Sequence, residues 1–157
     1  MKKFKLTSEF IVDISGVKLF RIKALIEFGN VKAGDLGGYI EKEENLSHMG
    51  NAWVFGNAQV FGDARVFGNA WVSGDAWVSG NAQVSGDKDY AYAHGFGSCN
   101  RTTTFFRLKD GDVGVRCGCF YGTLAQFRDN VCETHGETKK AQEYLMLADL
   151  MDFRFKN

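Results

Sequence analysis

Several things are scarce or missing in this chain of 157 residues. Proline is absent, so almost every backbone amide is able to donate to a hydrogen-bonded ladder. Nineteen basic residues balance nineteen acidic ones, so charge gives no argument for binding nucleic acid or an anionic membrane. The N-terminus MKKFKLTSEF lacks the apolar stretch of a signal peptide, and no segment approaches a membrane span. We therefore expect a cytoplasmic protein whose four cysteines are thiols or thiolates rather than disulfides.

A six-residue repeat fills the middle of the chain, from Gly50 to Asp87. It reads GNAWVF, GNAQVF, GDARVF, GNAWVS, GDAWVS, GNAQVS and GD. A period this short predicts a solenoid of stacked units. Alanine and valine stand two places apart in each unit, so both point inward from a strand, and the Gly-Asn or Gly-Asp between units supplies the corner. With three strands to a turn, this 18-residue coil resembles the hexapeptide-repeat left-handed parallel β-helix.

The expected fold is therefore mainly β. It is a short left-handed parallel β-helix of hexapeptide repeats, capped by an N-terminal β segment and a C-terminal ββαα unit. Residues 1–49 are predicted to form a β hairpin and an irregular entry coil, residues 50–98 the β-helix with its closing segment, and residues 99–157 the ββαα unit. Lys88 stands where the next inward alanine would fall, and an unpaired lysine inside so narrow a prism is too costly, so the repeat is expected to end there.

Turn chemistry predicts the flanking elements. A turn over Asp13–Gly16 predicts an N-terminal hairpin. The Gly37–Gly38 pair favours tight turning into the repeat over a phosphate-binding loop, which needs a helix directly after it. Asp110–Gly111 predicts a two-residue hairpin loop. That loop pairs Leu108 with Val113, Phe106 with Val115 and Thr104 with Cys117.

Two helices are predicted near the C-terminus. Thr123 and Gln126 fit a capping box at the start of the first, and His135–Gly136 ends it. The second begins at about Thr138 and is apolar around most of its circumference. We therefore expect the second helix to be buried on more than one side.

Aromatic residues occupy many outward positions of the repeat. Stacking at 18 residues places Trp53 beneath Trp71, and it places Phe67 beside Arg65 and Gln83. Soluble monomers rarely leave so large an aromatic surface bare. We expect the terminal segments or another copy of the chain to cover it, in preference to a foreign partner, and a homo-oligomer (dimer or trimer) is predicted. The candidate interface residues are Trp53, Phe55, Phe61, Phe67, Trp71 and Trp77.

The face of the predicted C-terminal hairpin that carries Arg107 and Arg116 is the candidate binding site. In the two-residue-loop register, Arg107 lies across from Gly114 and Arg116 lies across from Phe105. Two guanidinium groups above glycines, with Phe105 nearby, would suit a phosphate and a stacked base. A solvated outer face is the simpler interpretation.

The cysteines and histidines suggest chemistry only weakly. Cys117, Cys119, Cys132 and His135 form a possible zinc set, but their spacing matches no familiar frame, and buried core thiols are favoured over a metal site. No cofactor is predicted. None of the histidines, His48, His94 and His135, is an evident general base, and no catalytic residue is assigned.

The whole chain resembles a group of phage and prophage hexapeptide-repeat proteins. The resemblance lies in KAGDLGGYIEKEENLS leading into the GNAWV repeats and in CGCFYGTLAQF, ETHG and AQEYL afterwards. Such proteins are called transferase-like from their fold alone, and fold does not establish function. The resemblance implies a phage accessory protein in a bacterial cytoplasm.

These observations lead to one preferred function and two alternatives. The preferred one is a non-catalytic binding protein that self-associates and engages a host target, either a defence protein or a nucleotide signal, as a counter-defence inhibitor. The first alternative is a hexapeptide-repeat acyltransferase with its site at a trimer interface. The second is a structural scaffold.

Overall fold

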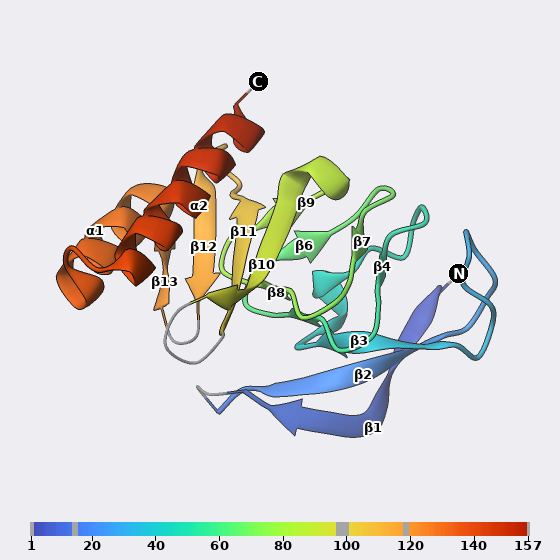
Figure 1. The fold of residues 1–157 in the computed structure, drawn as a ribbon. Coiled ribbons are helices and arrows are strands. Elements are labelled where there is room, and N and C mark those ends of the chain that lie inside the picture. The colour runs from blue at the N-terminus through green and yellow to red at the C-terminus, as the bar shows by residue number, and fades with distance from the viewer. Residues whose placement is uncertain (1, 14–15, 97–100, 118–119, 157) are drawn as a thin grey trace.

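The computed structural model describes residues 2–13, 16–96, 101–117 and 120–156. Within these ranges the protein is mainly β, and its strands divide among several small sheets. The repeat segment (residues 50–87) lies in the middle of the molecule, with an N-terminal hairpin on one side and a sheet covered by two helices on the other (Figure 1).

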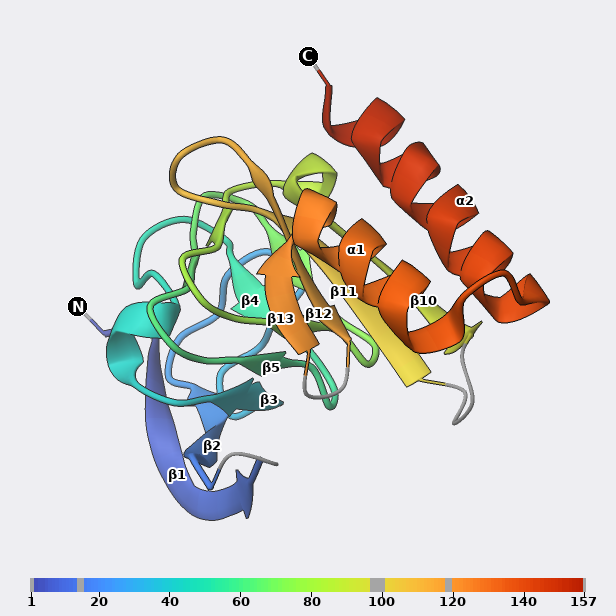
Figure 2. The same cartoon turned by 90° about the vertical axis from the view of Figure 1, so that its left-hand side faces the viewer.

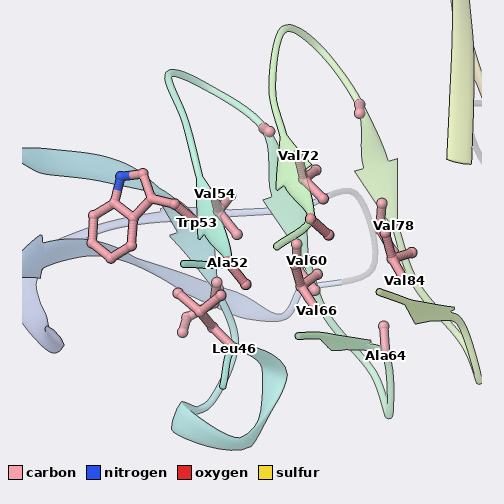
Figure 3. Close-up of a cluster of buried hydrophobic side chains, with 14 of the residues drawn as sticks. Leu46, Ala52, Trp53, Val54, Val60, Ala64, Val66, Val72, Val78 and Val84 are labelled. Atoms are coloured by element: carbon pink, nitrogen blue, oxygen red, sulfur yellow. The ribbon is translucent and has the colours of Figure 1, made fainter. Parts of the chain in front are cut away.

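The repeat segment forms six strands of two residues each, and their inward side chains make the core. The strands are β4 (Trp53–Val54), β5 (Gln59–Val60), β6 (Arg65–Val66), β7 (Trp71–Val72), β8 (Trp77–Val78) and β9 (Gln83–Val84). Each of the first three pairs in parallel with the strand 18 residues further on: β4 with β7, β5 with β8 and β6 with β9. The six valines are fully buried and point into one interior (Figure 3). The prediction that A-x-V points inward is confirmed.

The predicted fold class, a left-handed parallel β-helix, is wrong. The strands are mostly short and are not arranged as a continuous left-handed β-helix. The largest sheet has five strands in the order β1-β2-β3-β5-β8 and mixes antiparallel with parallel pairs. One physical reason is that a glycine with φ between 59° and 72° turns the chain after every unit, which leaves only two residues of ladder per strand. Another is that the N-terminal strands extend one of the ladders.

The N-terminal strands are β1 (Phe4–Val12), β2 (Lys18–Ala24) and β3 (Leu36–Ile40). The predicted hairpin is confirmed, because β1 and β2 pair antiparallel up to Val12 opposite Lys18. Strand β3 then pairs antiparallel with β2 and parallel with β5, so it joins the hairpin to the repeat segment.

The prediction of a turn at Gly37–Gly38 is wrong. Both glycines are buried within β3. A Cβ atom on Gly38 would lie 2.6 Å from the carbonyl oxygen of Ala58 and 2.7 Å from Cγ1 of Val54. Glycine is therefore needed here because the strand packs closely against the repeat segment, not because the chain turns.

The turn of chain that leads into the repeat segment is two residues longer than the regular turns. Ile40 pairs with Val60 and Leu46 with Val66, so the offset is 20 residues instead of 18. A short 3₁₀ helix, η1 (Glu43–Asn45), lies in between. The buried Asn45 side chain donates hydrogen bonds to the carbonyl oxygens of Gly62 (3.1 Å) and Ala64 (2.9 Å), which fastens this irregular turn to the first regular one.

A four-stranded antiparallel sheet follows the repeat segment. After the 3₁₀ helix η2 (Asp87–Asp89) come β10 (Tyr90–Phe96), β11 (Arg101–Arg107), β12 (Val113–Cys117) and β13 (Phe120–Thr123), in that order across the sheet. The predicted ββαα unit is therefore wrong, because the observed sheet has two more strands than predicted. Strand β10 lies within the predicted closing segment of residues 50–98, but its alternating aromatic and small residues pair with β11. Lys88 is exposed at the end of the repeat segment, as expected.

The register of the β11–β12 hairpin differs by one residue from the prediction. Arg107 lies opposite Val113, and Phe105 lies opposite Val115. The Leu108 amide donates to the Asp112 carbonyl oxygen (2.8 Å), so three residues form the loop, with Gly111 at φ +90°. A glycine in this conformation at the end of a three-residue loop is a common hairpin geometry. A shift of one residue changes which side chains of β11 and β12 share a face of the sheet.

The helices α1 (Leu124–His135) and α2 (Lys139–Phe155) cover the face of this sheet that is turned away from the repeat segment (Figures 1 and 2). The capping box is confirmed: Thr123 Oγ1 accepts from the Gln126 amide, and Gln126 Oε1 accepts from the Thr123 amide. No helix among the described residues is long and apolar enough to cross a membrane.

The expectation that the second helix is buried on more than one side is wrong. Its buried residues share one face, which packs into the core beneath it: Ala141, Tyr144, Ala148, Met151 and Phe155. The opposite face carries apolar residues that are exposed: Met146, Leu150 and Phe153.

Candidate functional site

Two adjoining cavities form a groove along one side of the repeat segment. Their volumes are about 630 and 430 Å³, and Glu44, Arg65 and Gln83 line both. We call this feature the Arg65 groove. Its remaining lining residues are Lys2, Lys42, Glu43, Leu46, Ser47, His48, Asp63, Ala64, Val66, Phe67, Asn81 and Lys109.

The floor of the groove comes from paired positions of β6 and β9. Arg65 lies opposite Gln83 in this parallel pair, and both side chains point outward because the adjacent valines, Val66 and Val84, point inward. Phe67, two residues beyond Arg65, is 37% exposed. The groove therefore presents a guanidinium group, an amide and an aromatic ring side by side.

Two other outward positions of the repeat segment are covered by the N-terminal part of the chain, whereas the Arg65 side is not. Trp53 is buried by Phe4 and Phe28 of the N-terminal segment. Phe61 packs with Leu19 and Tyr39 in a separate small core. Among the described residues, the Arg65 side is flanked by Lys2, by the segment from the η1 turn to His48 and by the loop after β11, and a groove stays open between them.

The charged groups at the rim are largely paired with one another. Lys2 Nζ lies 3.1 Å from Glu43 Oε1, and Lys42 Nζ lies 3.1 Å from Asp63 Oδ1. Among the described residues, Arg65 makes no side-chain hydrogen bond or ion pair, although it lies between these pairs. Arg65 is thus a cation available to a ligand.

His48 stands at one end of the groove with both ring nitrogens engaged. The Lys3 amide donates to Nδ1 (3.1 Å), which fixes the proton of the neutral ring on Nε2, 3.0 Å from Glu43 Oε1. The ring also stacks on Phe4 at a centroid distance of 4.2 Å. The hydrogen bond from Lys2, with help from His48, holds the pKa of Glu43 below its usual value. His48 is thus held by its neighbours, and Glu43 is a weak base.

The predicted binding residues Arg107, Arg116 and Phe105 are not brought together. Arg107 shares a face with Phe105 and Val113, beneath the helices, and Phe105 is fully buried there. Arg116 lies opposite Thr104 and so points to the other face. The one-residue change of register separates the two guanidinium groups.

Arg107 has a structural role on its own face. Its Nε donates to Asp89 Oδ1 (3.2 Å), its Nη2 donates to the Phe155 carbonyl oxygen (3.2 Å), and its guanidinium lies over the Phe155 ring. Burial acts to raise the pKa of Asp89, but hydrogen bonds from Ser85 and Arg107 outweigh it and lower that pKa. Arg107 therefore ties the end of α2 to the end of the repeat segment.

Arg116 lies over Phe61, with its guanidinium carbon 5.1 Å from the ring centroid. Its Nε atom is buried and, among the described residues, has no hydrogen-bond partner; the same holds for Gln59 Oε1 and Ser79 Oγ. Gln59 and Ser79 belong to the same side of the repeat segment as Phe61. Arg116 is thus a packing residue between the β11–β12 sheet and the repeat segment.

The predicted interface aromatics are mostly covered within the chain. Trp53 is 1% and Phe61 is 6% exposed, while Phe55 and Trp77 are partly buried. Only Phe67 and Trp71 reach solvent substantially, at 37% and 36%. The terminal segments, which were one of the expected covers, bury Trp53 and Phe61.

The possible zinc set is only partly described. Cys119 lies outside the described residues, while Cys117 is half-buried and Cys132 is exposed, and both are free thiols. His135 stacks on Tyr144. Within the ranges that the structure describes, no three metal-binding side chains gather into a site.

The chain matches no protein-family model, and the search of curated proteins found none with significant similarity to it. The function is therefore argued from the geometry of the groove. Sequence reasoning placed Arg65, Gln83 and Phe67 together but did not identify them as a site. The available signal was that Arg65 and Gln83, which stack at the 18-residue spacing, are both polar at a position where three of the six units carry tryptophan.

Proposed function

We propose that this protein is a non-catalytic binding protein, and that the Arg65 groove holds a small anionic ligand with a planar group, such as a nucleotide. The observation that carries the proposal is an exposed arginine that makes no side-chain hydrogen bond or ion pair among the described residues, at the centre of a groove where Lys2 and Lys42 are already paired with carboxylates. A guanidinium group forms strong, bidentate hydrogen bonds with phosphate and carboxylate.

The neighbours of Arg65 suit the rest of such a ligand. The exposed ring of Phe67 offers a stacking surface, and the Gln83 amide supplies both donors and an acceptor. Lys109 adds a second exposed cation at the far end of the groove. An anion of nucleotide size is matched by these groups and by the volume of the two cavities.

The titratable groups support binding more than catalysis. A general base works best when its pKa lies near the working pH. The pKa of Glu43 is instead lowered by Lys2, and both nitrogens of His48 are committed to neighbours. The acyltransferase alternative needs a free base at such a position.

The biological role we propose is sequestration of a host nucleotide signal in a bacterial cytoplasm. It rests on the resemblance of the chain to phage and prophage proteins. A ligand held by groups that do not turn it over would be withheld from its receptor.

The test measures binding by calorimetry with AMP, a cyclic dinucleotide and acetyl-CoA as separate probes. We expect a nucleotide to bind, and we expect Arg65→Ala to weaken it about 10- to 100-fold, because a hydrogen bond to a charged group contributes about 1.5–3 kcal/mol. Lys5→Ala, an exposed cation on β1 outside the groove, is the matched control and should bind normally.

Three results decide the proposal. Failure of all probes to bind at millimolar concentration overturns it, as does binding that Arg65→Ala leaves unchanged. Turnover of acetyl-CoA with an acceptor would favour the acyltransferase instead. Native mass spectrometry of gently purified protein gives a second measurement, since a retained ligand adds its own mass.

A further inference from the structure

The two cavities of the Arg65 groove differ in the residues that they do not share. Phe67 and Leu46 line only the larger cavity, of about 630 Å³. Lys109 and Asn81 line only the smaller cavity, of about 430 Å³. One end of the groove therefore offers an aromatic ring, and the other end is mostly polar.

The backbone pairing explains this order along the groove. Phe67 follows Arg65 by two residues, so both side chains leave the same outward face of the repeat segment. The Arg65 amide donates to the Ala82 carbonyl oxygen (2.9 Å), and the Lys109 amide donates to the Asn81 carbonyl oxygen (3.0 Å). Arg65 and Lys109 thus lie on either side of two consecutive residues. The groove runs from the Phe67 ring past the Arg65 guanidinium group to Lys109.

Most of the charges that line only one cavity are paired within it. In the larger cavity, Lys2 Nζ lies 3.1 Å from Glu43 Oε1. In the smaller cavity, Lys42 Nζ lies 3.1 Å from Asp63 Oδ1. Lys109 is exposed and, within the described part of the chain, its ammonium group makes no hydrogen bond or ion pair. Lys109 is thus the free cation of the smaller cavity.

The remaining charged and titratable lining residues do not offset this difference. Arg65 and Glu44 line both cavities, so they add the same charge to each. His48 lines the larger cavity, but its Nδ1 accepts a hydrogen bond from the Lys3 amide, so the ring is neutral. The smaller cavity therefore carries one more positive charge than the larger one.

We propose that the ligand of the Arg65 groove is a nucleotide with two linked phosphates, its base on the Phe67 ring and its diphosphate between Arg65 and Lys109. This inference rests on the proposed function, and it adds the class of nucleotide and its direction in the groove. Bases stack on aromatic rings through their π faces, and arginine and lysine bind phosphate oxygens through charge-assisted hydrogen bonds. A monophosphate would reach Arg65 and leave Lys109 without a partner.

The reverse direction is unfavourable on two counts. It would bring the diphosphate to the larger cavity, which lacks the free cation that Lys109 supplies to the smaller one. It would also bring the base to the smaller cavity, whose described lining residues include no aromatic ring. Charge and stacking therefore select the same direction.

The first experiment compares AMP with ADP, and GMP with GDP, by calorimetry on the full chain. The buffer holds no divalent cation, so no metal ion neutralises the phosphates. The wild type should bind the diphosphate about 5- to 20-fold more tightly than the monophosphate, between the effect of an exposed ion pair and that of a hydrogen bond to a charged group. Lys109→Gln should remove this difference by weakening the diphosphate alone. Lys5→Gln, an exposed cation outside the groove, is the matched control and should preserve it.

The second experiment tests the direction of the ligand with Phe67→Ala. This variant should weaken the monophosphate and the diphosphate by the same factor, about fivefold or more, because both carry the base that stacks on the ring. The ratio of the two affinities should therefore stay at the wild-type value. Circular dichroism on each variant separates a folding defect from a binding defect.

The inference is overturned if monophosphate and diphosphate bind equally well, if Lys109→Gln leaves their ratio unchanged, or if Phe67→Ala changes it. Binding of a cyclic dinucleotide without binding of any diphosphate also overturns it. In each of these cases, the proposed function still stands if Arg65→Ala weakens whichever nucleotide binds. A wild type that binds no nucleotide overturns both.

Discussion

The ammonium group of Lys3 donates a 2.6 Å hydrogen bond to the carbonyl oxygen of Ala52, inside the first regular turn of the repeat segment. A second, longer bond of 3.3 Å reaches the carbonyl oxygen of Gly50, and the ring of Phe28 lies 4.6 Å away. The Lys3 residue is only 1% exposed. This buried cation closes the open end of the core with hydrogen bonds where the repeat offers no further strand.

Burial lowers the pKa of Lys3 to about 8, from an ordinary value of 10.5. Between these two pH values the unfolded chain binds one more proton at this position than the folded chain does. The free energy of unfolding should therefore rise with pH across this range, by up to about 3 kcal/mol, and the contribution should be flat below pH 8. Urea unfolding of the wild type and of Lys3→Met, compared pH by pH, isolates the contribution of this residue. A difference between them that does not change from pH 7 to 10.5 contradicts the prediction.

The ion pair between Asp89 and Arg107 should also make the free energy of unfolding rise with pH, but in the acid range. Hydrogen bonds from Ser85 and Arg107 outweigh burial and lower the pKa of Asp89 below 3.8, so its stabilisation is present above that pH and lost as the pH falls through the folded-state pKa. Asp89→Asn should cost about 1–3 kcal/mol at neutral pH and progressively less in acid. Asp63→Asn is the control, because the Asp63 side chain is 78% exposed and its loss should cost under about 0.5 kcal/mol. An equal cost at both positions would refute the role of Asp89.

Trp53 and Trp71 provide a matched pair with different burial. They are direct partners in the β4–β7 ladder, but Trp53 is 1% exposed and Trp71 is 36% exposed. Trp53→Ala should lower the free energy of unfolding by about 3–5 kcal/mol, because it opens a cavity among Phe4 and Phe28. Trp71→Ala should cost about 1 kcal/mol, chiefly the edge contact with Phe55. Chemical denaturation measures both, and similar values would contradict the burial described here.

Gly38→Ala should be strongly destabilising. The added Cβ would lie 2.6 Å from the Ala58 carbonyl oxygen, so β3 would have to move away from the repeat segment. Overpacking of this kind costs about 1–3 kcal/mol. Gly86→Ala is the control, since nothing lies within 4 Å of a Cβ there and its backbone, at φ −162°, suits any residue. A melting temperature unchanged by Gly38→Ala would show that β3 is free to shift.

The sequence predicts local patterns well, but it predicts contacts between distant segments poorly. The period fixed the inward alanines and valines and the 18-residue pairing, because each follows from spacing alone. The capping box at Thr123 and the N-terminal hairpin followed from turn and cap chemistry. The overall class did not follow, since strand β3 and the hairpin join one ladder of the repeat segment and turn it into a mixed sheet.

The candidate site was missed for a related reason. A two-residue loop and a three-residue loop both fit Asp110–Gly111, and only the second sets Arg107 and Arg116 on opposite faces. The N-terminal part of the chain covers Trp53 and Phe61 and leaves the Arg65 side open. Which outward side of the repeat segment stays open depends on tertiary packing and not on any local motif.

The irregular entry at Asn45 has a consequence for how the chain folds. Every inward position of the repeat segment is an alanine or a valine, so a turn that slides over the next by one six-residue unit still places alanine on alanine and valine on valine. Such slipped pairings have nearly the same internal contacts and compete with the native one. The groups that distinguish them lie at the two ends: the Asn45 amide on the carbonyl oxygens of Gly62 and Ala64, and the Tyr90 hydroxyl on the Trp71 carbonyl oxygen. The correct strand register therefore depends on a few residues outside the repeat, because the repeat itself fits several registers almost equally well.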